Sequence, residues 1–288
     1  MIKYNPKSWI KLIFALHKSD TIRILWKEMI YIGLLAWAIT WLEITYLPEM
    51  KALKNLNIIY SLVGFVISLL LVFRTNTAYD RWWEGRKKWG ELVNDSRNIS
   101  LKLSTLNLKE EDRQYFARMI ANFAIASKDQ LKKQVVPENL DLNTEEWTQL
   151  RMVDHIPVGI VQFMYNRLMK LKQSGVILKE DFLALEYNLN GFTNMIGACE
   201  RIRNTPIPFS YSLFIKKFIF IYTCTLPIAF VSLLGYFSVI VTVLVFYVLV
   251  SMEILAEEIE DPFGLDDNDL PTEELAERIK SLSANLLK

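Results

Sequence analysis

The residues of this sequence whose types could do chemistry are concentrated in one acidic stretch near its C-terminal end. Nine carboxylates lie between Glu257 and Glu274, in the sequence EEIEDPFGLDDNDLPTEE. Carboxylate oxygens are the ligands that a hard cation such as calcium prefers, although the glycine position and the distal glutamate spacing differ from the EF-hand pattern. A solvated turn whose acids cap the next helix would explain the same stretch, so both interpretations stay open. Four aspartates surround the Pro-Phe-Gly turn: Asp261, Asp266, Asp267 and Asp269.

One further group resembles catalytic machinery only superficially. Glu200 with Arg201 or Arg203 could pair a carboxylate with a guanidinium clamp. No nucleophile–base pair, glycine-rich phosphate loop or metal-ligand spacing lies near these residues, so structural ion pairing is the better interpretation. The two histidines and two cysteines are too few for a His-rich metal site or a disulfide framework. We therefore expect that the protein is not an enzyme.

The helices that position these residues are expected to include long apolar ones, because 52% of the 288 residues are hydrophobic and many of them lie in uncharged runs. A membrane helix needs about 20 apolar residues, and the longest run, of 35 residues, suits two helices joined near Leu234–Ser238. We therefore predict four transmembrane helices. The formal net charge of +1 gives no global field that would attract nucleic acid. Three runs contain no Asp, Glu, Lys or Arg: Met29–Leu42, Asn55–Phe73 and Phe218–Met252.

The distribution of Lys and Arg predicts the orientation of these helices. Six of them lie within Met1–Lys27, and five more lie within the fifteen residues Arg74–Lys88. The segment between the first two runs has only Lys51 and Lys54. Because positive residues are retained on the cytoplasmic side, both termini and the large middle region should be cytoplasmic. Met1–Lys27 lacks the apolar core of a signal peptide. The four predicted spans therefore indicate a multi-pass membrane protein.

The fold class that follows is an all-α membrane protein with a large cytosolic helical region. In the middle region, Asn143 and Glu146 have the spacing of a capping box. Pro157 can begin a helix that ends near Gly175, and a further helix runs over Lys179–Arg203. We expect five segments: an N-terminal cytosolic segment (1–28), transmembrane helices 1 and 2 (29–73), the cytosolic helical region (74–217), transmembrane helices 3 and 4 (218–252), and the acidic segment with a C-terminal helix (253–288).

The second apolar run passes without a linker into the sequence FRTNTAYDRWWEGRKKWGE, Phe73–Glu91. The plainer interpretation is an anchor where the chain leaves the membrane, with tryptophans at the headgroups and arginines on the cytoplasmic side. The alternative is that the second span continues into the cytosolic region as one long helix. Acids and arginines at spacings that permit ion pairs along a helix are compatible with both.

The second run also carries an apolar stripe. Phe65, Leu69 and Phe73 follow one another at i, i+4 and i+8, so they share one helix face. Lipid contact explains such a stripe, whereas symmetric copies around an axis would form stacked apolar rings that gate a pore by dewetting. The pattern alone leaves both open. We expect the neighbouring stripe to pack on other helices: Leu62, Val66 and Leu70.

Three stretches of the chain resemble signatures of the bestrophin family: FRTNTAYDRWWEGRKKWG, CERIRNTPIPFSY and EDPFGLDDNDL. They occur in order over nearly the whole chain, and its length is similar to that of bacterial members. The resemblance implies a homopentameric ion channel of the bacterial inner membrane. Its single pore would run along the fivefold axis through the membrane and a cytosolic vestibule, and its partners would be its own copies, the bilayer and monovalent ions.

The resemblance also assigns roles by position. The family's apolar neck falls on Phe65, Leu69 and Phe73. Its cytosolic aperture falls near Val176–Leu178, with Ile177 as the expected lining residue. Calcium is a candidate rather than a certain cofactor, because animal members carry Asn where this chain has Asp261. The family's calcium clasp falls on four acids: Glu258, Asp261, Asp266 and Asp269.

The resemblance implies two kinds of selectivity, because animal bestrophins conduct anions while bacterial relatives are cation-permeable. Glu43 and Glu49 should lie near the outer mouth, where carboxylates raise the local cation concentration. The main prediction is therefore a passive channel for monovalent cations of the sodium type. The alternatives are a chloride channel and, from a different class, a membrane-anchored helical scaffold.

Overall fold

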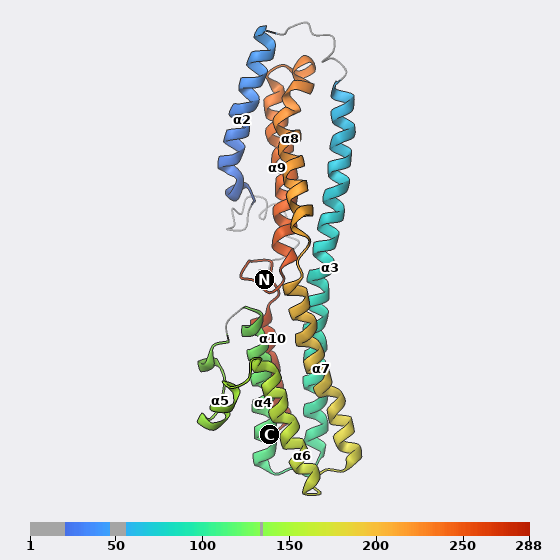
Figure 1. Cartoon of the computed structure of the whole chain (residues 1–288), viewed down its shortest axis with the longest axis vertical. Helices are drawn as coiled ribbons and strands as arrows, with labels where there is room; N and C mark the ends of the chain where they lie inside the picture. The colour runs from blue at the N-terminus through green and yellow to red at the C-terminus, as the bar shows by residue number, and fades with distance from the viewer. Residues whose placement is uncertain (1–20, 47–55, 133–134) are drawn as a thin grey trace. The chain divides into compact units, whose positions relative to one another are not determined.

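The computed structural model describes residues 21–46, 56–132 and 135–288, and this part of the chain contains helices but no strand (Figure 1). The all-α prediction is therefore confirmed for the described residues. In chain order, the elements are α2 (Thr21–Tyr46), α3 (Leu56–Thr105), α4 (Glu110–Leu131), the 3-10 turn η2 (Pro137–Asn139), α5 (Thr144–Leu150), α6 (Ile156–Gln173), α7 (Lys179–Asn204), α8 (Phe209–Leu234), α9 (Phe237–Glu260) and α10 (Thr272–Leu286).

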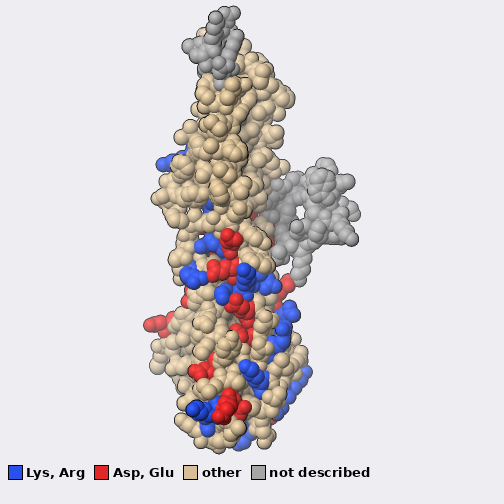
Figure 2. Space-filling model, turned by 90° about the vertical axis from the view of Figure 1, so that its right-hand side faces the viewer, with Lys and Arg blue, Asp and Glu red and all other residues tan. Residues whose placement is uncertain are grey.

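The chain divides into two compact units, and α3 contributes to both. The apolar unit comprises the described part of Ile2–Asp80 together with Pro206–Glu260. The polar unit comprises Arg81–Thr205 and Asp261–Lys288. On the face drawn in Figure 2, charged side chains are spread over the polar unit, whereas the apolar unit shows few.

Among the described residues, four helices are long and apolar enough to cross a membrane: α2, α3, α8 and α9. Their number agrees with the prediction, although α2 begins at Thr21 rather than at Met29, because the helix continues beyond the uncharged run. The turn expected near Leu234–Ser238 is present between α8 and α9. Gly235 has a φ of 53° there, a conformation that favours glycine.

The second predicted span is the start of one unbroken helix, α3, which is 50 residues long. The alternative of a span that continues as a single helix is therefore confirmed. Neither proline nor any other helix breaker interrupts this sequence, and its three glycines are tolerated within the helix.

The core of the apolar unit lies where α3, α8 and α9 pack together. Ile67 and Leu71 of α3 contact buried residues of α8 and α9, including Ile219 and Leu249. Two buried hydroxyl pairs satisfy polar groups that hydrocarbon would leave unpaired. Thr40 Oγ1 lies 3.1 Å from Ser238 Oγ, and Ser251 Oγ lies 2.9 Å from Thr21 Oγ1.

The polar unit is a helical bundle around α4, whose second half is almost entirely buried. Phe123 of α4 packs on Phe192 of α7 with ring centroids 4.8 Å apart. The predicted capping box between Asn143 and Glu146 begins α5, and α7 covers the range expected for it. The helix predicted at Pro157 is α6, which ends before Gly175, where φ is 73°.

Candidate functional site

The stripe expected to line a pore lies on an open face of α3. Phe65, Leu69 and Phe73 are all exposed within the single chain. On the opposite face of the same turns, the side chains of Ile67 and Leu71 are buried. The stripe is therefore free to face an axis shared with other copies or to face lipid, and its role as a neck stays a prediction.

The neighbouring stripe, Leu62, Val66 and Leu70, is not the one that packs within the chain. Leu62 and Val66 are exposed and Leu70 is half-buried within the single chain, so contact of this stripe with helices of other copies stays a prediction. The packed stripe is displaced by one residue and includes Val63, Ile67 and Leu71. Because successive side chains of a helix are about 100° apart, an offset of one residue turns the stripe by about 100° around the helix axis.

A buried ionic cluster follows the neck stripe directly. Arg74 is 0% exposed, and its Nη2 donates to Glu260 Oε2 at 2.7 Å. Its Nε lies 3.6 Å from Glu253 Oε2, and Glu253 is also buried. This cluster was not predicted from the sequence, where Arg74 counts only as a positive charge on the cytoplasmic side. The signal was the heptad spacing of Glu253 and Glu260, which puts both carboxylates on one face of α9.

Within the polar unit, the three stretches that resemble family signatures meet one another. The guanidinium of Arg81 donates to the carbonyl oxygens of Ile202 and Thr205, which joins the first stretch to the second. Trp82 Nε1 donates to the carbonyl of Asn268 at 3.0 Å, which joins the first stretch to the third. Arginine and tryptophan are needed here as long donors that reach backbone carbonyls of other segments.

The carboxylate-and-clamp group is structural, as expected. Glu200 Oε1 lies 2.7 Å from His155 Nε2. Arg201 pairs with Glu84, and Arg203 donates to the carbonyl of Gln130 at 2.8 Å. Each charged group therefore connects α7 to another segment of the polar unit.

Two acids of the expected calcium clasp accept hydrogen bonds from the backbone. Asp269 Oδ2 accepts from the Asp266 amide at 2.6 Å, and Asp261 Oδ1 accepts from the Phe263 amide at 3.3 Å. Burial raises the pKa of Asp269 to about 7; the hydrogen bond from Asp266 opposes this shift, while repulsion by Asp266 and Asp261 adds to it. Glu258, the fourth expected acid, lies in α9 of the apolar unit.

The expected calcium clasp stays a prediction. Calcium takes six to eight oxygen ligands that converge on one point. Among the described residues, no group of three or more His, Cys, Asp or Glu could hold a metal ion. Two of the four acids, Asp261 and Asp269, accept hydrogen bonds from backbone amides of the turn, and within the described part of the chain Asp269 Oδ1 is buried without a hydrogen-bond partner.

Burial argues against Ile177 as the aperture residue. Its side chain is 2% exposed because it packs into the core of the polar unit. A side chain enclosed by its own chain has no surface left to line an opening between copies. Val176 and Leu178, the other residues of the expected segment, are 41% and 66% exposed and stay candidates.

The acid expected at the outer mouth is also buried. Glu43 is 8% exposed within the apolar unit, so little of its carboxylate meets solvent. Glu49 lies outside the described residues. Glu43 therefore does not support a preference for cations in the way that was predicted from the sequence.

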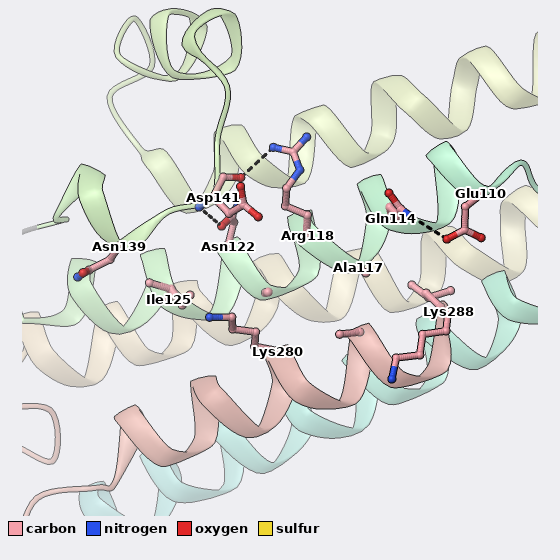
Figure 3. A pocket seen from close by; sticks show the side chains of 13 residues that line it. Glu110, Gln114, Ala117, Arg118, Asn122, Ile125, Asn139, Asp141, Lys280 and Lys288 are labelled. Atoms are coloured by element: carbon pink, nitrogen blue, oxygen red, sulfur yellow. Dashed lines mark hydrogen bonds between the residues drawn. The ribbon is translucent and has the colours of Figure 1, made fainter.

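A pocket of about 300 Å³ lies in the polar unit between α4, α10 and the segment around Asp141 (Figure 3). Asn122 exchanges two hydrogen bonds with the Asp141 backbone, and Arg118 donates to the same carbonyl, so the wall is preformed. Lys280 and Lys288 lie on the opposite wall. The lining has no hydroxyl, thiol or imidazole group, and its charged side chains are Glu110, Arg118, Asp141, Lys280 and Lys288.

Comparison with known proteins identifies the family. The family model described as Bacterial/Fungal Bestrophin protein matches residues 1–284. The chain belongs to the bacterial bestrophin family. It is therefore a multi-pass membrane protein of a channel-forming family, and the prediction that it is not an enzyme is confirmed.

Two curated relatives match this bestrophin-family chain over almost its whole length. One from Nostoc sp. is 31% identical over 95% of this chain and 90% of its own length. One from Salmonella typhi is 31% identical over 97% of this chain and 92% of its own length. Both are named voltage-dependent anion channel-forming proteins.

Solved structures show the same fold. The crystal structure of a bacterial bestrophin homologue from Klebsiella pneumoniae superposes with a TM-score of 0.83 and 26% sequence identity. The match covers 90% of this chain and 97% of that chain. The four candidate membrane helices and the helical polar unit therefore form a bestrophin fold.

Proposed function

We propose that five copies of this chain form an anion channel whose neck is lined by Phe65, Leu69 and Phe73. The observation that carries the choice of anions is the name shared by relatives that are 31% identical over at least 95% of the chain. The sodium-type preference expected from the sequence is replaced here by its chloride alternative, because Glu43 is buried rather than exposed at a mouth.

The exposed stripe on α3 supports the neck. Identical copies related by a closed symmetry would bring each stripe residue into a ring. Adjacent rings would be roughly 6 Å apart along the helix, one per turn. Such rings offer no ligand to a partly dehydrated ion, so a narrow ring empties of water and stops conduction until it widens.

The apolar unit supports the assembly of several copies in a bilayer. Its exposed side chains include large aromatic and aliphatic groups on α2, α3, α8 and α9. Exposed apolar surface on this scale requires lipid or other chains to cover it. The charge distribution described above favours a cytoplasmic location for both termini and the polar unit.

Reversal potentials of the purified protein in liposome-derived bilayers would test the selectivity. A tenfold NaCl gradient places the ideal sodium and chloride potentials about 59 mV on either side of zero. We expect the reversal potential to shift toward the chloride value. A shift toward the sodium value would restore the cation prediction, and the absence of current in all salts tested would favour the scaffold.

The mass of the purified protein would test the assembly independently. Light scattering with correction for detergent should give about five times the 33.6 kDa of one chain. A protein mass corresponding to one or two chains would contradict a ring with a central neck.

A further inference from the structure

A polar contact made by Arg74 restricts rotation of α3, the helix that carries the proposed neck, about its own axis. Ile67, Leu71, Arg74 and Ala78 follow one another along the buried face of α3, and Arg74 is the one charged residue among these four. Apolar contacts between Ile67 or Leu71 and their neighbours are non-directional, so small rotations change them little. A charged hydrogen bond has a preferred geometry, so Arg74 restricts the rotation of this turn more than the aliphatic side chains do.

Arg74 connects three segments of the apolar unit. Its Nη2 donates to Glu260 Oε2 at 2.7 Å, at the end of α9. Glu260 Oε1 accepts from the Ile207 amide at 2.6 Å, just before α8 begins. The same carboxylate therefore bridges α3 and the residues that precede α8. A change in this contact would be felt by α3 and by both helices of the α8–α9 pair.

Several polar atoms of Arg74 and Glu253 lack a hydrogen-bond partner, so few hydrogen bonds fix the position of the Arg74 side chain. Within the described part of the chain, Arg74 Nε and Nη1 have no hydrogen-bond partner, and neither has either carboxylate oxygen of Glu253. The Arg74–Glu253 separation of 3.6 Å is that of an ion pair rather than a hydrogen bond. The hydrogen bond from Arg74 to Glu260 is therefore the main directional contact of the buried Arg74 guanidinium.

Phe73 and Arg74 are consecutive, so their side chains leave the helix about 100° apart. While Arg74 is held against α9, Phe73 is held on the exposed face. We infer that Arg74, through Glu260, is the positioning residue for the Phe73 ring of the neck. This inference rests on the proposed function, because a ring exists only if copies assemble around a pore.

A double-mutant cycle tests whether Arg74 acts through Phe73. The variants are Arg74→Lys, Phe73→Ala and the pair of them, with single-channel open probability as the readout. Lysine keeps the charge but lacks the planar fork of arginine. We expect Arg74→Lys to raise open probability about fivefold or more, a scale typical of coupled neighbours, and to have no further effect when Phe73 is Ala.

Further variants separate positioning from a general loss of stability. Glu260→Gln retains an oxygen that can accept from Ile207 and weakens the pairing with Arg74, so it tests the same contact if Arg74→Lys fails to assemble. It should show the same dependence on Phe73. Lys216→Gln breaks the exposed Lys216–Glu257 pair of the same unit and should leave open probability unchanged. Thermal unfolding of each variant reports stability separately.

The outcomes distinguish this inference from the proposed function. If Phe73→Ala leaves gating unchanged, or the wild-type protein passes no current, the neck itself is wrong, and a positioning role for Arg74 is overturned with it. If Phe73→Ala opens the channel but Arg74→Lys or Glu260→Gln changes open probability by the same factor in both backgrounds, the neck stands. In that case only the positioning role of Arg74 is overturned.

Discussion

Gly85 and Phe263 lie so close together that a methyl group on Gly85 would be 3.0 Å from Phe263 Cζ. Leu270 and Pro262 would also lie within 3.4 Å of it. Gly85 belongs to the first of the three family stretches, and Phe263 belongs to the third. The glycine is therefore required for close packing of the turn on α3 and not for an unusual backbone conformation.

Gly85→Ala should lower the stability of the polar unit by about 1–3 kcal/mol, because an extra methyl group in a filled contact forces its neighbours to shift. Thermal unfolding followed by circular dichroism would measure the loss. Gly197→Ala is the matched control, since nothing lies within 4 Å of a methyl group at that helical position. It should be neutral or stabilise by up to about 1 kcal/mol. Equal losses for the two variants would contradict the packing argument.

His155 makes two contacts that can be separated by mutation. Its Nδ1 accepts from the Val158 amide at 3.3 Å and caps α6, so in the neutral ring Nε2 carries the proton that faces Glu200. His155→Asn retains a capping acceptor and should lower the free energy of unfolding by about 1 kcal/mol. His155→Ala removes both contacts and should lower it by about 2 kcal/mol. Identical losses would show that the cap contributes nothing.

Glu146 should make the polar unit sensitive to acid. Burial acts to raise its pKa, but hydrogen bonds from Arg118, at 2.6 and 2.7 Å, and from the Asn143 amide outweigh burial and hold its pKa below the usual value. A carboxyl with a depressed folded pKa contributes stability above its unfolded pKa of about 4.3 and loses it as pH falls through the folded value.

Glu146→Gln should therefore destabilise the protein at pH 7 and have a smaller effect as the pH is lowered below about 4. Thermal unfolding across this range would measure the difference from wild type. Glu145→Gln, at an exposed carboxylate of the same turn, should give a nearly constant difference. A constant difference for Glu146→Gln as well would show that its carboxylate does not provide the linkage.

Local patterns predicted the helices well, while burial within the folded chain escaped them. The capping box at Asn143 and the turn at Gly235 depend on a few adjacent residues, so the sequence contained their signals. The partners of Arg74 depend on which face of α3 meets α9. The burial of Ile177 and Glu43 likewise depends on helix packing that a single sequence does not reveal. Which stripe of α3 packs within the chain, Val63, Ile67 and Leu71, depends on helix packing in the same way.

The acidic turn should matter more for stability than for calcium. Replacing Asp261, Asp266 and Asp269 together with Ala removes the two side-chain caps on the Phe263 and Asp266 amides. A loss of about 1–3 kcal/mol in unfolding free energy is expected from the lost caps. Channel currents should respond to calcium no differently from wild type. Glu277→Ala on the exposed face of α10 is the control for charge. Loss of a strong calcium-induced rise in current would contradict this prediction.

The last prediction concerns the two faces of α3 in the apolar unit. Truncating Phe65, Leu69 and Phe73 to Ala should widen the proposed rings and keep the pore wetted, because each ring loses the apolar groups that exclude water. We expect single-channel recordings to show open probability rising about tenfold, equivalent to about 1.4 kcal/mol. The stability of the assembly should change little, because these side chains are exposed within each chain.

The packed face provides the matched control. Ile67 and Leu71 are buried, so truncating either to Ala should cost about 2–5 kcal/mol of stability through the cavity that it leaves. Gating in the protein that still assembles should stay close to wild type. If Ile67→Ala or Leu71→Ala opens the channel while the Phe65, Leu69 and Phe73 variant leaves currents unchanged, the pore would have to be lined by the other face of α3. The rings would then be built from residues that the single chain buries, and the assembled subunits would have to pack differently from the single chain.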